Sequence, residues 1–266
     1  MRDITLRALD VLASADLIAA EDTRNTSHLL THHQISTNKQ MAVHQHNERG
    51  SAEKIIALLQ AGKSVAFVSD AGTPAVSDPG ALLVQAVRAA GLKVIPIPGA
   101  NAAIAALSAA GMAETHFLFY GFLPNKSAAR RTVLKKLIAE SFSLVFYEAP
   151  HRIVECVTDL RAVLGDERQI VIAREITKMF ETIHSCTLRE AEKWLLSDSN
   201  QQRGEFVLLV SGALPQDGLK VEALDTLSLL LKELPLKQAV QLATKLTGAN
   251  RNELYQQALE IKNSED

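Results

Sequence analysis

At 266 residues the chain is long enough to bury a substantial core without metals or disulfides. Its formal net charge of −2 gives no overall attraction to nucleic acid, so a polyanionic partner would need a local basic patch. Cys156 and Cys186 stand far apart, which favours a reducing compartment over a disulfide framework. No stretch resembles a membrane span, and charges interrupt the first apolar segment, unlike a signal peptide. The sequence therefore predicts a soluble cytoplasmic protein.

The first part of the chain, up to about Gly111, alternates helical segments with short apolar runs. The runs predicted as strands are LIAAE, MAVHQ, SVAFVSD and KVIPIPG. The predicted helices are ITLRALDVL, TSHLLTHH, SAEKIIALLQAG, PGALLVQAVRAAG and ANAAIAALSAAG. This alternation predicts an α/β domain with a mainly parallel sheet that is covered on both faces.

A second set of strands follows, and it suggests a smaller mixed sheet. These predicted strands are THFLFYGF, LVFYE, QIVIARE, TIHSCT and EFVLLVSG. The turn-rich GALPQDG then breaks the pattern, and two short helices flank Gly248 and Asn250 in a helix-turn-helix arrangement. We expect two α/β domains, at residues 1–114 and 115–213, and a small helical domain at 220–266.

Charged residues follow the first predicted strand, Leu17–Ala20, in the stretch IAAEDTRNTSHLL. In open α/β sheets, ligands bind at the carboxyl ends of the strands. Glu21, Asp22 and Arg24 therefore form either part of a site or a solvated turn in which the charges pair with one another.

Two further loops follow predicted strands. In SDAGTPAVSDPG, Asp78 suits a helix N-cap, Pro79 suits the first helical position, and Gly72 and Gly80 allow close approach of a ligand. KVIPIPG likewise runs into a helix of small residues, whose first N–H groups could face a ligand. The loops predict one shared pocket, with ordinary capped turns as the alternative. Neither loop contains GxGxxG or GxxxxGK[ST].

These motifs match a known family. The stretches EDTRNTSHLL, SDAGTPAVSDPG, IPGANAAIAAL, YGFLP, FYEAPHR, AREITKMFE and GEFVLLV occur in this order. Together they resemble the bacterial ribosomal RNA small subunit methyltransferase I family, within the tetrapyrrole methylase superfamily. The resemblance implies two α/β domains with S-adenosylmethionine in the cleft between them. It also implies methylation of a cytidine ribose 2′-OH in small-subunit ribosomal RNA.

The resemblance implies a set of cofactor-binding residues in both α/β domains. The set comprises Asp70, Ala71, Gly72, Thr73, Pro98, Gly99, Ala100 and Asn101 in the first domain, with Tyr120, Leu123 and Tyr147 in the second.

Methyl transfer to a neutral ribose hydroxyl needs alignment and a group that accepts the proton. Glu21 or Asp22 could accept it, while Arg24 pairs with a phosphate or holds the carboxylates. His46 and Asn47 would help orient the ribose. The alternative is a structural pairing of Arg24 with the carboxylates.

The local basic patch is predicted on the helix NKSAARRTVLKKLIAE. We expect one charged face to contact RNA phosphates, although a solvated helix face is the alternative. The charged residues are Lys126, Arg130, Arg131, Lys135 and Lys136, and the predicted buried face is Val133, Leu134, Leu137 and Ile138. Arg152 and Lys178 are further candidates for the same RNA-binding surface.

His28 and His32 have ligand-like spacing, but no HExxH motif accompanies them, so we expect no metal. We expect a homodimer with no membrane partner. Two other activities stay open: methylation of a tetrapyrrole carbon, and ribosome binding without catalysis.

The start of the chain departs from the pattern of the resembled family. That family places a strand and a glycine-bearing loop ahead of DITLRAL, whereas Met1 and Arg2 stand here instead. We therefore expect the first strand to be missing, through either an incorrect start site or an impaired paralogue.

Overall fold

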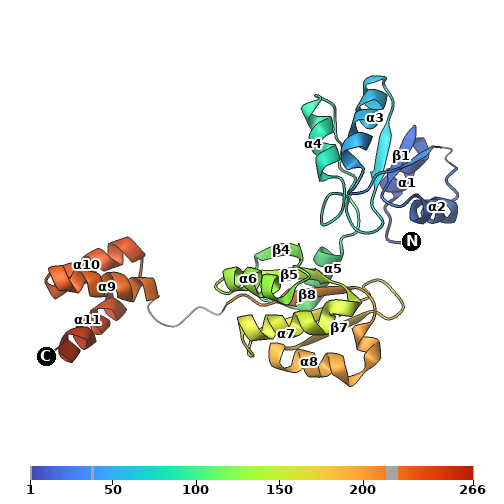
Figure 1. Ribbon diagram of the computed structural model, residues 1–266. Coiled ribbons are helices and arrows are strands. Elements are labelled where there is room, and N and C mark those ends of the chain that lie inside the picture. Colours follow the sequence, from blue (N-terminus) through green and yellow to red (C-terminus); the bar gives the residue numbers. More distant parts are fainter. Residues whose placement is uncertain (1, 37–38, 214–220, 266) are drawn as a thin grey trace. The chain divides into compact units, whose positions relative to one another are not determined.

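The computed structural model describes residues 2–36, 39–213 and 221–265 (Figure 1). The turn-rich segment expected after Ser211 lies largely outside the described residues. None of the helices in the described part of the chain has the length and apolar character needed to cross a membrane. The chain divides into two compact units, of which the first is Met1–Ile138 with Phe142–Ser211 and the second is Ala139–Ser141 with Gly212–Asp266.

The first α/β part of the larger unit is a parallel sheet with helices on both faces. In chain order its elements are α1 (Leu6–Ser14), β1 (Leu17–Ala20), α2 (Thr23–His32), β2 (Gln40–Ala42), α3 (Glu48–Gln60), β3 (Val65–Val68) and α4 (Ala81–Ala89). The strand order within the described residues is β2-β1-β3. Ile18 of β1 packs with Leu12 and Leu30, whereas the adjacent Ala19 faces the other way and packs with Ile55. The doubly covered parallel sheet is therefore confirmed.

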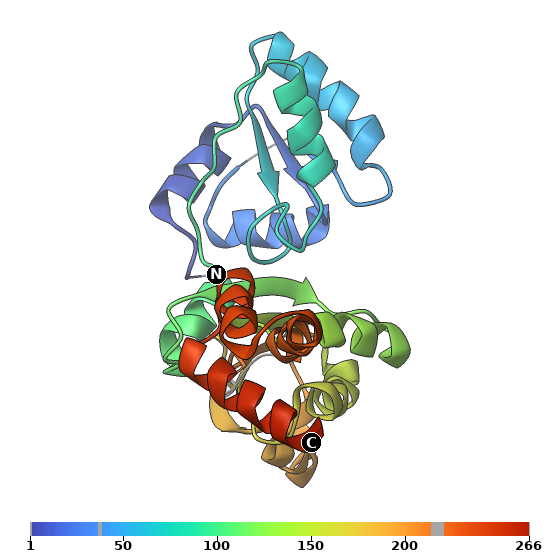
Figure 2. The same ribbon diagram turned by 90° about the vertical axis from the view of Figure 1, so that its left-hand side faces the viewer.

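One predicted strand of this part is wrong. Residues 93–99 pair with no strand among those the structure describes, and they run as an extended connection from α4 to α5 (Ala102–Ala110) (Figure 2). Pro96 and Pro98 have no N–H to donate to a ladder, and Ile95 is 60% exposed. The apolar run 93–99 has no neighbouring strand to pair with, so its composition alone is not enough to form a strand. The described residues before β1 hold α1 and no strand.

The second α/β part is a five-stranded mixed sheet within the described residues, with strand order β4-β5-β8-β6-β7. Its main elements are β4 (Phe117–Phe122), α6 (Ser127–Leu137), β5 (Ser143–Glu148), α7 (Ile153–Leu164), β6 (Gln169–Arg174), β7 (Thr182–Thr187), α8 (Leu188–Ser197) and β8 (Phe206–Val210). Short 3₁₀ turns occupy Pro150–Arg152 and Ser199–Gln202. The mixed sheet expected from the sequence is confirmed.

Helices cover both faces of this sheet as well. On one face α5 packs over Val145 and Leu209. On the other face α6, α7 and α8 enclose a larger core that includes Leu134, Phe146 and Leu195. The small side chains of α5 let it lie close against its face, which brings the start of that helix to the sheet.

Three strands of the mixed sheet end at the same edge. β4 runs parallel to β5, and β8 runs antiparallel to both β5 and β6, so β4, β5 and β6 point the same way. Phe122, Tyr147, Val207 and Ala173 lie side by side in one row near that edge. We call this row and the connections that leave it the carboxyl edge of the second sheet.

The smaller unit is a helical domain with a core of its own. Its described helices are α9 (Val221–Glu233), α10 (Leu236–Thr247) and α11 (Arg251–Glu265). Leu227, Val240 and Leu254 join the three helices in one buried cluster. α10 ends at Gly248, whose left-handed φ of 70° makes the turn into α11. The predicted helix pair is present, and α9 packs against it.

Candidate active site

The carboxyl ends of β1 and β3 are fastened together by two carboxylates. The Asp22 N–H donates to Asp70 Oδ1 at 3.2 Å, and the Asp70 N–H donates to Glu21 Oε2 at 3.2 Å. Parallel neighbouring strands end at one edge, so the two predicted loops meet there. The structure thus brings Glu21, Asp22 and Asp70 together.

Asp22 and Arg24 form the ion pair that the sequence left open. Arg24 Nη2 lies 2.6 Å from Asp22 Oδ2, and the Arg24 N–H donates to Asp22 Oδ1 at 2.8 Å. Asp22 is also the N-cap of α2. Hydrogen bonds from Arg24 lower the pKa of Asp22 to about 2. Asp22 is therefore a weak base at neutral pH.

The loop after β3 has an unusual backbone. Ala75 and Ser77 adopt left-handed φ values of 66° and 62°, a conformation that costs energy for residues with a side chain. Gly72 and Gly80 also have positive φ. Such strain persists where the surroundings fix the loop, and it gathers at functional sites.

A buried glutamate fixes the far end of this loop. Glu48 Oε1 accepts hydrogen bonds from the Gly80 N–H at 3.1 Å and the Leu83 N–H at 2.9 Å. The N-cap of α4 is Gly80, so the expectation that Asp78 caps the helix and Pro79 begins it is wrong. Glu48, from another helix, supplies the capping oxygen instead, which leaves Asp78 free of that role.

Asp78 is the carboxylate of this site that sequence reasoning missed. Burial, together with the nearby negative charges of Glu21 and Asp70, raises the pKa of Asp78 to about 6. A raised carboxyl pKa in a cluster of acids is a recognised sign of acid–base function. The sequence signal was a second carboxylate, after Asp70, in the loop that follows β3, although its environment could not be read from the sequence.

The helix α5 begins with its N–H groups already occupied. Asn101 Oδ1 accepts from the N–H groups of Ala103 and Ile104 at 3.0 and 3.2 Å. The Tyr147 hydroxyl lies 3.3 Å from the Ala103 nitrogen and 3.5 Å from Asn101 Oδ1. The expectation that these helix N–H groups are open to a ligand is therefore wrong at Ala103 and Ile104. Asn101 and Tyr147 do lie together, as two predicted cofactor residues should.

The other predicted residues of these two loops are accessible to a ligand. Thr73 is half-buried, and the exposed ones are Ala71, Gly72, Pro98, Gly99 and Ala100.

Aromatic side chains line the carboxyl edge of the second sheet. Phe119 and Phe122 both pack edge-on against Tyr147, with ring centroids 5.0 and 5.6 Å apart. Phe122 is 51% exposed and Tyr120 is 39% exposed. Leu123 is buried in the core, and its carbonyl accepts from Arg152, so the expectation that Leu123 closes over the cofactor is wrong.

The strained loop of the first sheet meets this aromatic edge. Gly121 lies at a register shift in β4, and a Cβ atom there would come within 2.5 Å of Ser77 Oγ. The pKa of Tyr147 is raised, mainly by burial and further by the charge of Asp78. Carboxylates of the first sheet therefore lie near the aromatic rings of the second sheet, which makes this region the candidate site.

Several residues predicted to bind RNA have structural partners instead. Arg130 is fully buried, where it pairs with Asp159 at 2.7 Å, so its placement on the charged face is wrong. Arg152 donates to the Leu123 carbonyl and pairs with Glu148. Both arginines lie inward because carboxylates in α7 or β5 neutralise them.

Two further predicted RNA contacts are also engaged. Lys178 pairs with Glu175 and Glu205, and Asn47 bonds the Ala42 carbonyl and the His44 N–H.

The exposed charges of α6 remain as a basic surface. Lys126, Lys135 and Lys136 are exposed, and no ion pair is recorded for them within the described residues. Arg131 is half-exposed and bonds Asp159. Ile138 is 47% exposed rather than buried. His46 is exposed beside His44.

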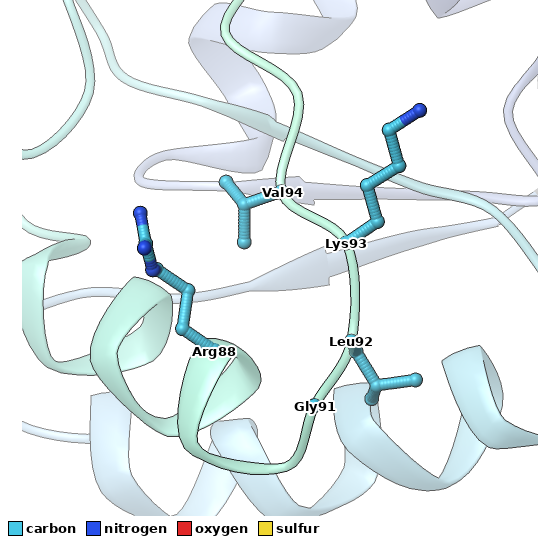
Figure 3. A pocket seen from close by; sticks show the side chains of 5 residues that line it. All are labelled: Arg88, Gly91, Leu92, Lys93 and Val94. Atoms are coloured by element: carbon cyan, nitrogen blue, oxygen red, sulfur yellow. The ribbon is translucent and has the colours of Figure 1, made fainter.

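The hollow shown in Figure 3 is separate from the candidate site at the strand ends. It has a volume of about 350 Å³ and is lined by Arg88 and the residues Gly91 to Val94, after the end of α4. Because α4 runs back across its sheet, this hollow lies away from the strand ends where ligands bind. Within the described ranges, no group of three or more His, Cys, Asp or Glu side chains could hold a metal ion.

The fold is that of an α/β methylase built on two sheets, and its candidate site lies where the loops of the first sheet meet the second. Residues 1–192 match the family of Tetrapyrrole (Corrin/Porphyrin) Methylases, and residues 217–262 match the RsmI C-terminal HTH domain. The chain belongs to the tetrapyrrole methylase family, and within it to the ribosomal RNA small subunit methyltransferase I group.

Similar proteins support this assignment at both the sequence and the fold level. The Ribosomal RNA small subunit methyltransferase I of Pseudomonas aeruginosa is 52% identical over 97% of this chain and 92% of its own length. The protein of the same name from Escherichia coli O157:H7 is 50% identical over 98% and 91%. Among solved structures, the methyltransferase CobJ aligns with a TM-score of 0.59 at 22% identity, covering 80% of this chain and 90% of CobJ. That likeness shows the fold.

Proposed function

We propose that this protein transfers a methyl group from S-adenosylmethionine to the ribose 2′-OH of a cytidine in small-subunit ribosomal RNA. Family membership and the name shared by its relatives support the RNA substrate. The observation that carries the proposal is the cluster of Glu21, Asp70 and Asp78 beside the aromatic edge of the second sheet.

The residues present fit S-adenosylmethionine, which bears a positively charged sulfonium and an aromatic adenine. Burial raises the pKa of Asp78 most, and the negative charges of Glu21 and Asp70 raise it further, so a cationic group would relieve part of the cost of its ionised form. Exposed rings at Tyr120 and Phe122 suit a planar base. The holding residues would be those of the loops 70–73 and 98–101, which are exposed or half-buried, with Tyr120 and Tyr147. The bound cofactor supplies an electrophilic methyl group.

The chain itself has to position the ribose and accept a proton. Arg24 neutralises Asp22, whereas the pKa of Asp78, near 6, matches a general base at neutral pH. We assign proton acceptance to Asp78, with Glu21 next to it as the alternative carboxylate. Glu21 and Asp70 also hold the strand ends in place through their backbone hydrogen bonds.

The exposed lysines of α6 supply the attraction to RNA that the whole chain lacks. Lys126, Lys135 and Lys136 can contact phosphates, which position a nucleic acid without reading its sequence. His46 lies exposed at the end of the loop after β2 and would contact the ribose side of the substrate. We further propose a cytoplasmic homodimer.

The direct test maps ribose methylation in small-subunit RNA. Small subunits that lack the modification are incubated with the protein and S-adenosylmethionine, and 2′-O-methylation is read along the RNA. A new 2′-O-methyl group on one cytidine supports the proposal. No modification, combined with no heat of S-adenosylmethionine binding in calorimetry, would refute the methyltransferase proposal, and small-subunit binding retained in the same preparation would then favour a ribosome-binding role. Binding of the cofactor with no ribose methylation would point to another acceptor.

A further inference from the structure

The connection between β6 and β7, residues 175–181, is rigidly braced although it lies outside the sheet (Figure 1). Arg174 holds it by donating to the Phe180 carbonyl and to Thr182 Oγ1, both at 3.1 Å. The other end of the same guanidinium donates to the carbonyls of Asn200 and Arg203. One arginine thus ties the loop to the neighbouring turn.

Further contacts fix the backbone of the loop. Glu175 and Thr177 both have left-handed φ values, of 52° and 63°. The Thr177 N–H donates to Glu181 at 2.6 Å, and Lys178 Nζ lies 2.7 Å from Glu175 Oε1. At Gly204 a Cβ atom would come within 2.4 Å of the Glu175 side chain. The strained conformation is therefore enforced from several sides.

This rigid loop presents two large apolar side chains to solvent. Met179 is 90% exposed and Phe180 is 66% exposed. Lys178, the charged residue next to them, is neutralised by Glu175 and Glu205. The loop therefore presents apolar and aromatic surface next to the paired charges of Lys178, Glu175 and Glu205 and the exposed Glu181.

The loop leaves the carboxyl edge of the second sheet. Arg174 is in register with Phe206, and Phe206 with Glu148, the residue after Tyr147. Two strand spacings, about 10 Å, separate β6 from β5. Ile176, at the base of the loop, packs on the α5 face together with Tyr147. The exposed pair thus lies on the same edge as the proposed methyl-transfer site, a short distance along it.

We propose that Phe180, supported by Met179, is a stacking platform for an unpaired base that flanks the target nucleotide. This inference rests on the proposed function. A ribose hydroxyl can reach the cofactor only if its strand is held open, and unstacked bases are commonly held on aromatic side chains. Thioether sulfur also packs well against flat rings. Stacking on Phe180 would hold the strand while the α6 lysines hold its phosphates.

The test compares Phe180→Ala and Phe180→Trp with the control Phe117→Ala. Phe117 is also an exposed aromatic, at 45%, but it begins β4 and so lies at the opposite edge of the sheet. The probe is the small ribosomal subunit without the modification. Binding is measured at several salt concentrations, turnover is measured separately, and cofactor binding is followed by calorimetry.

We expect Phe180→Ala to weaken subunit binding by about 5- to 150-fold, the loss of one stacked base. The salt slope and the cofactor affinity should not change, Phe180→Trp should bind as the wild type does, and Phe117→Ala should have no effect. Unchanged subunit binding in Phe180→Ala would overturn the inference. A halved mass in light scattering, with that loss of binding, would also overturn it in favour of a contact between copies. Because binding is read without turnover, an inactive wild type would refute the proposed function alone.

Discussion

Replacing Arg130 should destabilise the protein rather than weaken its hold on RNA. The side chain is fully buried between α6 and α7, where it donates to Asp159 Oδ2 at 2.7 Å. It also donates to the carbonyls of Pro124 and Asn125, and its Nη2 lies 3.1 Å from Glu155. Removing one partner of a buried ion pair leaves the other uncompensated.

The magnitude follows from what remains around Asp159. Breaking a buried pair costs about 3–5 kcal/mol. In Arg130→Met, Asp159 keeps hydrogen bonds from Arg131 and Ser127, so we expect the lower end, about 3 kcal/mol. In Asp159→Ala, three donors lose the Asp159 carboxylate, and the buried Arg130 keeps only the two carbonyls and Glu155, so about 5 kcal/mol is expected. Lys135→Met, an exposed control on the same helix, should change stability by less than about 0.5 kcal/mol.

The assay uses the only tryptophan of the chain. Trp194, in α8, stacks on His184 with ring centroids 4.2 Å apart, so its fluorescence reports unfolding of the second sheet. Urea transitions of the variants are compared at equal slope. A loss below about 1 kcal/mol in Arg130→Met, with a reduced salt slope of RNA binding, would refute the buried assignment.

The pH dependence of the unfolding free energy gives a second test of the Asp159 network. Burial alone would raise the pKa of Asp159, but hydrogen bonds from Arg131, Ser127 and Arg130 lower it below its usual value. The ionised carboxylate therefore stabilises the fold above its ordinary pKa, ~3.9, and that contribution is lost as the pH falls through the lowered value. The stability gap between the wild type and Asp159→Ala should narrow in acid. A gap that widens would contradict this network.

Three further outcomes test the site. The double variant Lys135→Glu, Lys136→Glu should lose two phosphate contacts, so the slope of log binding constant against log salt concentration should become shallower by about 2. The slope is measured by titration at several ionic strengths. An unchanged slope would mean that α6 is a solvated face. Asp78→Asn should reduce turnover by about 10²- to 10⁴-fold and abolish the rise of activity through pH 6 that is expected of the wild type. Asp22→Asn should keep that rise, and the opposite pattern would exchange their roles. Gly80→Ala should destabilise the first sheet, measured by hydrogen exchange, because its Cβ would lie 2.3 Å from Phe67 at a φ of 126°; unchanged protection would contradict that clash.

Periodicity was sufficient to predict most helices and strands, and it contained a signal about Arg130 as well. Arg130 stands four residues before Leu134 and seven before Leu137, which places it on the buried face of α6. The sequence prediction nevertheless placed Arg130 on the exposed face because of its charge, since an arginine is buried only where a partner neutralises it. The partner, Asp159, lies 29 residues away, and this contact cannot be read from one sequence.

Other differences arise from tertiary context. The run before Pro98 reads as a strand by composition, but strand formation needs a neighbour to pair with, which composition does not supply. The carboxylates at the ends of β1 and β3 were predictable as neighbours from topology alone. The raised pKa of Asp78 was not, because it depends on burial and on the positions of Glu21 and Asp70. Leu123 matched a cofactor motif, yet its side chain fills the core.

The hydrogen bonds of Glu48 connect two regions that are distant in sequence. Its backbone follows directly after the loop of His46 and Asn47, while its carboxylate holds the first turn of α4, two residues beyond Asp78. One buried side chain therefore joins the segment that carries His46 to the helix start that follows Asp78, although 32 residues separate Glu48 from Gly80.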